Sequence, residues 1–492
     1  MKGAEHPVGA NGKANVLLAA PTSYLGRRLM LKLMERPEVR LRVLVADRRN
    51  LGGFPGAAPE IVEGDIFDDG VLRRAAEGID AAYFPVRFLG TDPEFDRQVK
   101  VFAGKFRDAC AAEGVGRIIF LGVLTRKDTR NETIQAMIDV GEILSARPER
   151  IPTVWLRAGF ILGSGSLLFE MLANLVQKLP LFPTPRWMET RISVIGARDL
   201  QEYLVRAIWI PLSGNVEVEI GLPPCSLRDM LAATARAMGL SRVFLPVPFK
   251  AKRMSPYILM LLTPFSARLS SMFIRMVVAA GKTHGDIPRE NAKRLFPGIV
   301  PATFEEVVSR AVEAIGQEEV VSRWTDSIDP IAASAAEERM SRSMFRDVRR
   351  ESFGTVAPEK IFRAVKSIGG KEGWFHFDIL WRVRGAMDKL AGGYGASIGR
   401  RAGEDLRVGD ILDVWKVIDL RERKRLLLKA QMKVAGEAWL EFRVEGNTLV
   451  QTAYHYPKGL TGRLYWYSMV PFHAFIFRDM VRSIVRRAEG ME

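Results

Sequence analysis

Short apolar segments alternate with amphipathic helical segments over the first 163 residues, and this alternation constrains the fold more than any other feature. Apolar runs typical of buried strands occupy residues 15–19, 40–46, 60–63, 81–86, 117–122 and 153–163. Apolar residues at helical spacing lie between them at residues 24–35, 71–77, 95–113 and 131–144. Such alternation indicates βαβ units, so we expect an α/β fold with a doubly wound parallel sheet. Right-handed crossovers then bring the helix N-termini to one edge of that sheet.

The pattern changes near residue 326, so a chain of 492 residues is expected to hold more than one core. Residues 1–14 are polar and lack the apolar centre of a signal peptide, which predicts a disordered leader. Residues 15–325 are assigned to the parallel-sheet domain and a small substrate lobe over its carboxyl edge. Residues 326–342 are polar and rich in Ala, which predicts a linker. Residues 343–492 combine a helix, several strands and a long final helix, which predicts an α+β domain.

The net charge of +15 is uneven, because residues 341–492 contain 28 Lys and Arg against 18 Asp and Glu. A basic surface attracts nucleic acid or anionic lipid, but it also occurs as an ordinary solvated face. Without a zinc-ligand set, an RNA-binding signature or a long basic run, we expect no nucleic-acid partner and no metal site. Two cysteines, Cys110 and Cys225, make no disulfide framework, which fits a reducing compartment such as the cytoplasm.

No apolar stretch reaches the roughly 18–20 residues that a membrane-spanning helix needs. Residues 257–265 and 464–477 come nearest, and each is interrupted by a proline, Pro264 and Pro471. We interpret both as buried or interfacial helices. Together with the basic C-terminal part, they leave open a peripheral association with an inner membrane.

The segment VLLAAPTSYLG lies where a Rossmann domain binds diphosphate. The G-x-x-G-x-x-G form of that turn needs three glycines, and Ala20, Ser23 and Gly26 occupy their positions here. A residue other than glycine adopts positive φ at a cost, and a Cβ at position 23 takes space near the diphosphate. The amides at the start of the helix still form an anion site, and hydroxyls can donate to phosphate. The candidate diphosphate-binding residues are Thr22, Ser23, Tyr24, Leu25 and Gly26.

The residues after the next strands predict the rest of a dinucleotide site. Asp47 after the second strand favours the ribose of NAD, whereas the adjacent Arg48 and Arg49 favour the 2′-phosphate of NADP. We expect a weak preference for NADP through Arg48, with a solvated turn as the alternative. Asp65 and Ile66 after the third strand are candidates to contact adenine, and Val86 ends the fourth strand beside them. Asp65 is equally typical of a turn or a helix cap.

The Tyr and Lys pair of ordinary short-chain dehydrogenases is missing. The helix that should hold it, residues 131–144, has neither residue type, and Thr125 is the nearest hydroxyl after the preceding strand. The one Y-x-x-x-K sequence, Tyr454 to Lys458, contains Pro457 and falls in the C-terminal part, so we attribute it to chance. The catalytic residues therefore stay unknown. Hydride transfer without the pair and cofactor binding without chemistry are both consistent with the sequence.

The chain resembles bacterial NAD(P)-binding proteins in which an atypical short-chain dehydrogenase domain, of the NmrA-like kind, precedes a domain of unknown function. Stretches that carry the resemblance include VEGDIFDDGVLRRAAEGIDAAYFPVRFLG, LRAGFILGSGSLLFEML, VGDILDVWKVID and GRLYWYSMVPFHAFIFRDM. The family usually keeps the glycine turn that this chain degrades, and it has His-Ser-Met where Arg87-Phe88-Leu89 stands here. It also lacks the Tyr and Lys pair, whose positions fall near Thr133 and Met137.

The C-terminal part is similar to START and polyketide-cyclase folds, in which a curved antiparallel sheet wraps a long helix around an apolar cavity. Aromatic residues suit such a pocket or ordinary packing equally well. They are Trp374, Phe375, Phe377, Trp381, Trp415, Trp439, Tyr465, Trp466 and Tyr467. His376, His455 and His473 are too scattered to indicate a metal site.

Three functions remain open from the sequence. The first is an NAD(P)-dependent oxidoreductase that acts on a hydrophobic small molecule, such as a quinone-like or lipid-like compound. The second is a protein that senses a dinucleotide, or binds a lipid or quinone, without catalysis. The third is a peripheral membrane or assembly factor.

Overall fold

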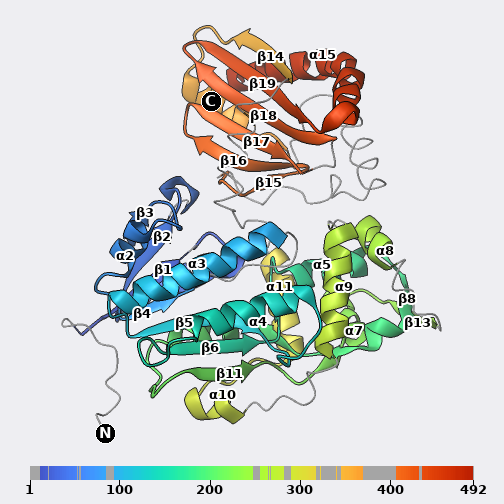
Figure 1. Ribbon diagram of the computed structural model, residues 1–492. Coiled ribbons are helices and arrows are strands. Elements are labelled where there is room, and N and C mark those ends of the chain that lie inside the picture. The colour runs from blue at the N-terminus through green and yellow to red at the C-terminus, as the bar shows by residue number, and fades with distance from the viewer. Residues whose placement is uncertain are drawn as a thin grey trace. The chain divides into compact units, whose positions relative to one another are not determined.

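The computed structural model separates into two compact units, Met1–Leu262 with Arg268–Ser327 and Thr263–Ala267 with Ile328–Glu492 (Figure 1). It describes residues 12–19, 21–51, 54, 57–84, 93–247, 255–263, 265, 267–281, 290–316, 322, 340, 345–369, 406–431 and 435–490.

The first unit is built on a seven-stranded sheet in the order β11-β6-β5-β4-β1-β2-β3, in which every pairing is parallel. Its strands are β1 (Ala14–Ala19), β2 (Val39–Val45), β3 (Glu60–Glu63), β4 (Ala81–Tyr83), β5 (Arg117–Val123), β6 (Thr153–Ala158) and β11 (Val216–Ile220). The strand order reverses between β1 and β4, and ligands of such sheets bind outside the carboxyl ends of the strands at this switch point. The expected doubly wound parallel sheet is confirmed.

Helices pack on both faces of this sheet, each against its own apolar core. On one face, α2 (Asp69–Ala76), α3 (Pro93–Ala112) and α4 (Glu132–Leu144) cover Leu17, Ile118 and Trp155. On the other, α1 (Tyr24–Met34), α6 (Ala197–Arg206) and α10 (Glu290–Leu295) cover Val16, Val43 and Leu156. The alternation of side chains along each strand supplies both cores, which explains why the strands read as continuous apolar runs.

The residues after β6 form a smaller lobe with three two-stranded sheets. These pair β7 (Phe160–Leu162) with β10 (Val194–Gly196), β8 (Leu181–Pro185) with β13 (Val243–Val247), and β9 (Arg191–Ile192) with β12 (Cys225–Ser226). The helices of the lobe are α5 (Leu167–Lys178), α7 (Leu227–Ala237), α8 (Ser255–Leu262), α9 (Ala267–Gly281) and α11 (Phe304–Gly316), with the short helix η2 (Arg186–Glu189) between β8 and β9. Another short helix, η1 (Arg48–Leu51), follows β2.

Two glycines make room for the indole of Trp155 beneath α4. A Cβ on Gly122 of β5 would lie 2.3 Å from the indole nitrogen, and one on Gly141 of α4 would lie 2.3–2.5 Å from three atoms of the ring. Both are closer than real side chains approach, so neither position accepts alanine without a shift of the indole or the backbone. This close packing fixes α4 against the end of β5, where the candidate site lies.

The second unit is a six-stranded antiparallel sheet in the order β14-β19-β18-β17-β16-β15. The strands and helices are β14 (Phe345–Ser352), α13 (Pro358–Lys366), β15 (Ile411–Leu412), β16 (Trp415–Arg421), β17 (Arg425–Ala430), β18 (Gly436–Glu445), β19 (Thr448–Pro457) and α15 (Gly459–Glu489). Apolar residues from α13, α15 and one sheet face form a single core, among them Val365, Phe442 and Met480. A separate C-terminal antiparallel domain is thus confirmed, whereas its likeness to START folds stays a prediction.

Several expected elements differ from the structure at particular residues. The strand expected over residues 81–86 ends at Tyr83, and residues 85–90 lie outside the described part of the chain. The strand and bend expected over residues 153–163 are two strands, β6 and β7, separated at Gly159, where a Cβ would lie 2.6 Å from the carbonyl oxygen of Ser193. The long final helix that the sequence predicts is observed as α15, which continues through Pro471. Among the described residues, no helix combines the length and the apolar character that crossing a membrane requires.

Candidate dinucleotide and substrate site

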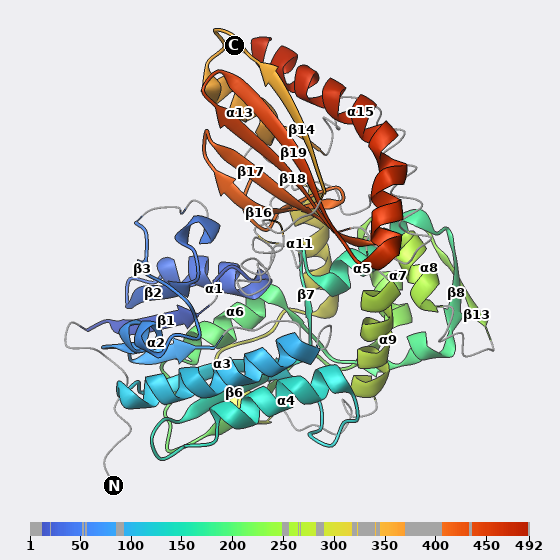
Figure 2. The same ribbon diagram turned by 45° about the horizontal axis from the view of Figure 1, so that its top comes forward.

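The candidate site lies at the carboxyl ends of β1, β5 and β6, where α1 and α5 begin (Figure 2). Both helices are capped by serine hydroxyls. The Oγ of Ser23 accepts a hydrogen bond from the amide of Gly26 at 3.0 Å, and the Oγ of Ser166 accepts one from the amide of Phe169 at 3.2 Å. Serine is among the preferred residues at this position because its oxygen satisfies an amide of the first helical turn.

Ser23 needs no glycine-like backbone in the turn between β1 and α1. Its φ of −77° and ψ of 166° are extended values that any residue adopts, and Pro21 and Thr22 also keep negative φ. The expected conformational cost of losing the second glycine is therefore absent at this position. The Ser23 side chain is buried, and its Oγ is hydrogen-bonded to the first turn of α1. Its Cβ is therefore the only part that takes up space in the turn between β1 and α1. Ala20, at the first glycine position, lies outside the described residues.

The first turn of α1 retains the features that bind an anion. The side-chain and carbonyl oxygens of Ser23 accept hydrogen bonds from the amides of Gly26 and Arg27. The amides of Tyr24 and Leu25 donate no hydrogen bond to any described residue. Gly26 is buried in the same turn. Amides at a helix start carry partial positive charge and suit phosphate oxygens. These residues fit the diphosphate of a dinucleotide, with Thr22 half-buried beside them.

Tyr24 and Arg28 tie α1 to the lobe. The Tyr24 hydroxyl donates to the carbonyl oxygen of Ser164 at 3.2 Å, and burial of that hydroxyl raises the pKa of Tyr24 to about 12. The guanidinium of Arg28 lies 4.9 Å from the Tyr24 ring centre and donates to the same carbonyl at 2.8 Å. Its Nε donates to the Oγ of Ser322 at 3.0 Å. The Tyr24 proton is therefore held in a structural bond, and the high pKa makes the phenol a weak acid.

The described residues after β2 include two exposed cations, Arg48 and Arg49, and Arg49 pairs with Asp47. The Asp47 carboxylate accepts from the Arg49 amide at 2.9 Å and from the Arg49 guanidinium. The Arg48 amide donates to Glu63 at 3.2 Å, but the exposed Arg48 side chain pairs with none of the described residues. The Arg49 guanidinium thus neutralises the Asp47 carboxylate, which would otherwise favour NAD. The Arg48 guanidinium is available to bind an anion.

The residues nominated after β3 and β4 are only partly described. The Asp65 carboxylate accepts from the Phe67 amide at 2.9 Å, and the N-cap of α2 is Asp68 instead. Asp65 thus has the turn role that was the alternative from the sequence, while its side chain remains exposed. Ile66 packs against the core beneath α2 and α3. Val86 lies outside the described residues, as do Arg87, Phe88 and Leu89.

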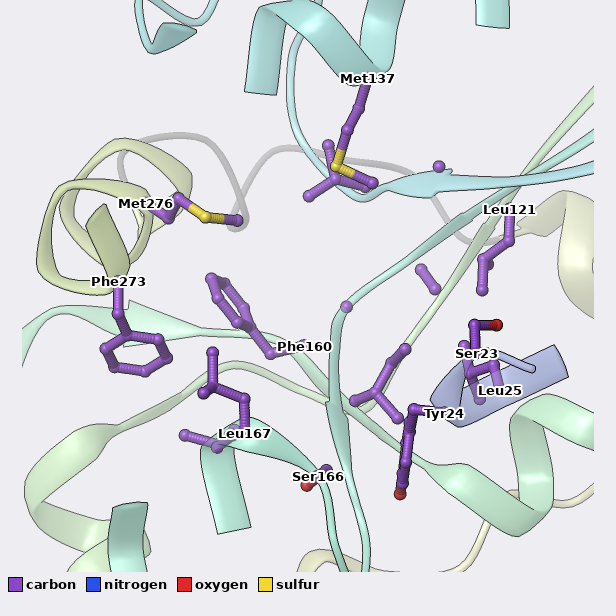
Figure 3. A pocket seen from close by; sticks show the side chains of 16 residues that line it. Ser23, Tyr24, Leu25, Leu121, Met137, Phe160, Ser166, Leu167, Phe273 and Met276 are labelled. Atoms are coloured by element: carbon purple, nitrogen blue, oxygen red, sulfur yellow. The ribbon is translucent and has the colours of Figure 1, made fainter. Parts of the chain in front are cut away.

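An apolar pocket opens beside the start of α1 (Figure 3). Ser23, Tyr24 and Leu25 lie on one side of it, and Phe160, Leu167, Phe273 and Met276 lie on the other, with Met137 above. The remaining residues that line it are Leu121, Gly122, Val123, Ala158, Gly159, Ile161, Ser166 and Leu168. Tyr24 is the only titratable residue among these sixteen. The pocket therefore suits an uncharged, apolar molecule.

The helix that would hold the Tyr and Lys pair presents other groups. Met137 of α4 lines the pocket near the expected position of the lysine, so a thioether stands where an ammonium would. Thr133 is buried, and Thr125 is fully buried with its hydroxyl 2.7 Å from that of Thr129. Neither threonine lines the pocket, and the thioether of Met137 can neither lower a tyrosine pKa nor relay a proton. No group of three or more His, Cys, Asp or Glu that could hold a metal occurs among the described residues.

The comparisons with known proteins agree with this geometry. Residues 22–147 match the family described as NAD(P)H-binding, which begins at the turn before α1. Residues 339–480 match a family described as a protein of unknown function, DUF2867. The chain joins an NAD(P)-binding domain to a DUF2867 domain. The expected combination of an NAD(P)-binding domain with a C-terminal domain of unknown function is confirmed, and the free amides of Tyr24 and Leu25 belong to the NAD(P)-binding domain.

Solved structures similar to the NAD(P)-binding domain include reductases and epimerases. Triphenylmethane reductase of Citrobacter sp., complexed with NADP(H), is 13% identical with a TM-score of 0.49 and covers 60% of this chain and 99% of its own. A nucleoside-diphosphate-sugar epimerase of Staphylococcus aureus is 15% identical with a TM-score of 0.46, covering 60% and 99%. WbmH of Bordetella bronchiseptica, in complex with NAD+, is 13% identical with a TM-score of 0.45, covering 62% and 99%. No curated protein matches the chain.

Sequence reasoning did not nominate the far wall of the pocket. Phe160 follows the break at Gly159, and Phe273 and Met276 lie three residues apart on α9, far along the chain from the turn. Their spacing of three indicates a shared helix face, which is also the signal of ordinary core packing. Only the fold shows that this face lies against β7 and α5.

Proposed function

We propose that the chain is an NAD(P)H-dependent reductase that passes a hydride to an apolar, ring-containing acceptor such as a quinone. The observation that carries this is the position of the apolar pocket, which shares Ser23, Tyr24 and Leu25 with the start of α1. The reduced nicotinamide supplies the hydride when the cofactor is bound. The amides of Tyr24 and Leu25 would hold the diphosphate of the cofactor, and Gly122 and Met137 line the pocket beside them.

The residues of the pocket orient the acceptor and exclude water, but they move no proton. Phe160 and Phe273, with ring centres 6.1 Å apart and nearly perpendicular, give a ring acceptor an aromatic wall. A quinone that accepts a hydride becomes a hydroquinone anion, which can take its proton from water at the mouth of the pocket. The tyrosine and lysine pair is needed for alcohol and ketone substrates, whose alkoxide is much more basic, and its absence is consistent with a quinone-like acceptor.

The direct test is to titrate the protein with NADPH and NADH by fluorescence, and then to follow cofactor oxidation with a panel of quinones and ketones. We expect binding of the reduced cofactor and oxidation with quinones but not with ketones. Binding without turnover would instead support a dinucleotide sensor, which the missing Tyr and Lys pair on α4 also favours. Absence of binding by either cofactor at millimolar concentration would rule out both functions.

Replacing Phe160 with alanine should weaken binding of a ring acceptor. Loss of one aromatic contact costs about 1 kcal/mol, so KM for the quinone should rise about fivefold while the affinity for NADPH changes little. Phe244 provides a matched control, because it is also a half-buried phenylalanine in a ring pair, with Phe182 at 5.3 Å, but lies outside the pocket. An equal rise of KM in Phe244→Ala would contradict the assigned role of Phe160.

We further propose that Arg48 gives the site a preference for NADPH. Replacing Arg48 with alanine should weaken NADPH binding about tenfold, because a guanidinium bound to phosphate contributes more than an ordinary hydrogen bond, and should leave NADH binding unchanged. Isothermal titration of both cofactors measures this. Arg40 is a suitable control, since it is exposed on the amino half of β2 and thus far from the carboxyl edge. Equal affinities of the wild type for both cofactors would refute the preference.

A further inference from the structure

Exposed apolar side chains gather on one part of the lobe of the NAD(P)-binding domain. On the β8–β13 ribbon, Leu181, Val243 and Leu245 are 49%, 55% and 45% exposed. On α8, Tyr257 and Ile258 are 60% and 40% exposed. Val243 pairs with Leu181 across the ribbon, and α8 lies beside the ribbon in both views of the molecule (Figures 1 and 2). We refer to these five residues as the ribbon patch.

The chain segments that form the ribbon patch contain basic residues but no acidic ones. From residue 230 to residue 285 the chain contains no Asp or Glu, and residues 171–188, which include β8, contain none either. The described parts of these segments carry the cations Lys178, Arg186, Arg236, Arg242, Arg268 and Arg275. Exposed apolar residues on segments that carry cations and no acidic residue match the surface of a bilayer that contains anionic lipid.

We propose that the ribbon patch docks the protein on an anionic bilayer surface. Apolar side chains enter the boundary between headgroups and acyl chains, Tyr257 lies at the level where tyrosine is enriched, and the cations face lipid phosphates. A second copy of the chain is a poorer occupant, because two identical patches would bring like charges together. The sequence predicted residues 257–265 to be a buried or interfacial helix, and the fold adds the ribbon, whose residues lie elsewhere in the chain.

The test is co-sedimentation of the full chain with vesicles of phosphatidylcholine alone and of phosphatidylcholine mixed with phosphatidylglycerol. We expect binding to the mixed vesicles that weakens as salt rises, because each cation near the surface contributes about 1 kcal/mol at low salt. The double variant Val243→Glu/Leu245→Glu should bind at least about tenfold less. Tyr257→Glu should bind less as well, and it tests the patch without altering the ribbon.

A matched control changes the same number of exposed apolar residues in the DUF2867 domain. Leu460 and Leu464 on α15 are 71% and 61% exposed, so Leu460→Glu/Leu464→Glu should retain vesicle binding. Thermal unfolding checks that each variant is folded. No sedimentation of the wild type at low salt, or equal loss in the control, would overturn the proposal. A change of molar mass with Val243→Glu/Leu245→Glu in light scattering, without any vesicle binding, would assign the patch to a second copy instead.

Discussion

Replacing Ser23 with aspartate is expected to abolish NAD(P)H binding while leaving the fold intact. Aspartate caps helices as well as serine does, so the hydrogen bond from the Gly26 amide is retained. The added carboxylate, however, would face the cofactor diphosphate. Two like charges about 4 Å apart repel by about 4 kcal/mol near a protein surface, which corresponds to a loss of affinity of about a thousandfold. Isothermal titration with NADPH measures the loss.

Two further variants distinguish the effect of the Ser23 helix cap on stability from the effect of the Ser23 side-chain volume on NADPH affinity. Ser23→Gly keeps most of the helix stability and should bind NADPH at least as well as the wild type, because it restores the glycine of the usual turn. Ser23→Ala loses the cap and should lower the stability of the domain by about 1 kcal/mol with little effect on affinity. Normal binding of NADPH by Ser23→Asp would mean that the diphosphate does not lie at the start of α1.

Replacing Glu441 with leucine is expected to destabilise the DUF2867 domain by about 3–5 kcal/mol, the usual cost of breaking a buried ion pair. Glu441 is 2% exposed and accepts from the Nε of Arg425 at 2.6 Å and from the Tyr454 hydroxyl at 2.8 Å. Its neighbour Arg443 lies 3.0 Å away. Leucine would leave the buried Arg425 with the Asp419 carboxylate, 2.8 Å away, but without that of Glu441, and the Tyr454 hydroxyl would lose the Glu441 acceptor. Urea unfolding followed by tryptophan fluorescence measures the effect.

The control for this change lies on the same strand. Glu445 ends β18 in an exposed position, so Glu445→Leu should alter the stability by less than about 0.5 kcal/mol. The double variant Arg425→Met/Glu441→Leu should recover much of the loss, because a buried pair replaced by apolar residues of similar volume is often neutral. Equal effects of the changes at 441 and 445 would show that the buried pair contributes nothing.

Periodicity predicted the architecture of the NAD(P)-binding domain because burial dictates it. Strands covered on both faces must be apolar throughout, and helices that cover them must be apolar on one side, so β1, β2 and α1 could be located from the sequence. Breaks inside a run were harder to find. Gly159 separates β6 from β7 because a distant carbonyl, that of Ser193, approaches it, and nothing near Gly159 in the sequence reports that approach.

The sequence nominated the β1–α1 side of the candidate site but not the opposite side of the pocket. The residues of the β1–α1 turn are adjacent in sequence and follow a known pattern, so Ser23 to Gly26 could be nominated directly. The sequence overestimated the cost of Ser23, because φ at that position depends on how the helix is capped. Phe160, Phe273 and Met276 meet only through the packing of the lobe, and an apolar residue that lines a pocket looks the same in sequence as one in a core.

The extended backbone of Ser23 has a consequence for recognising other proteins. A motif search that insists on three glycines would discard this chain, although a hydroxyl that closes the helix end leaves the neighbouring amides free for a ligand. Tolerating serine or threonine at the middle position, when a strand precedes and a helix follows, would bring such divergent turns back into view.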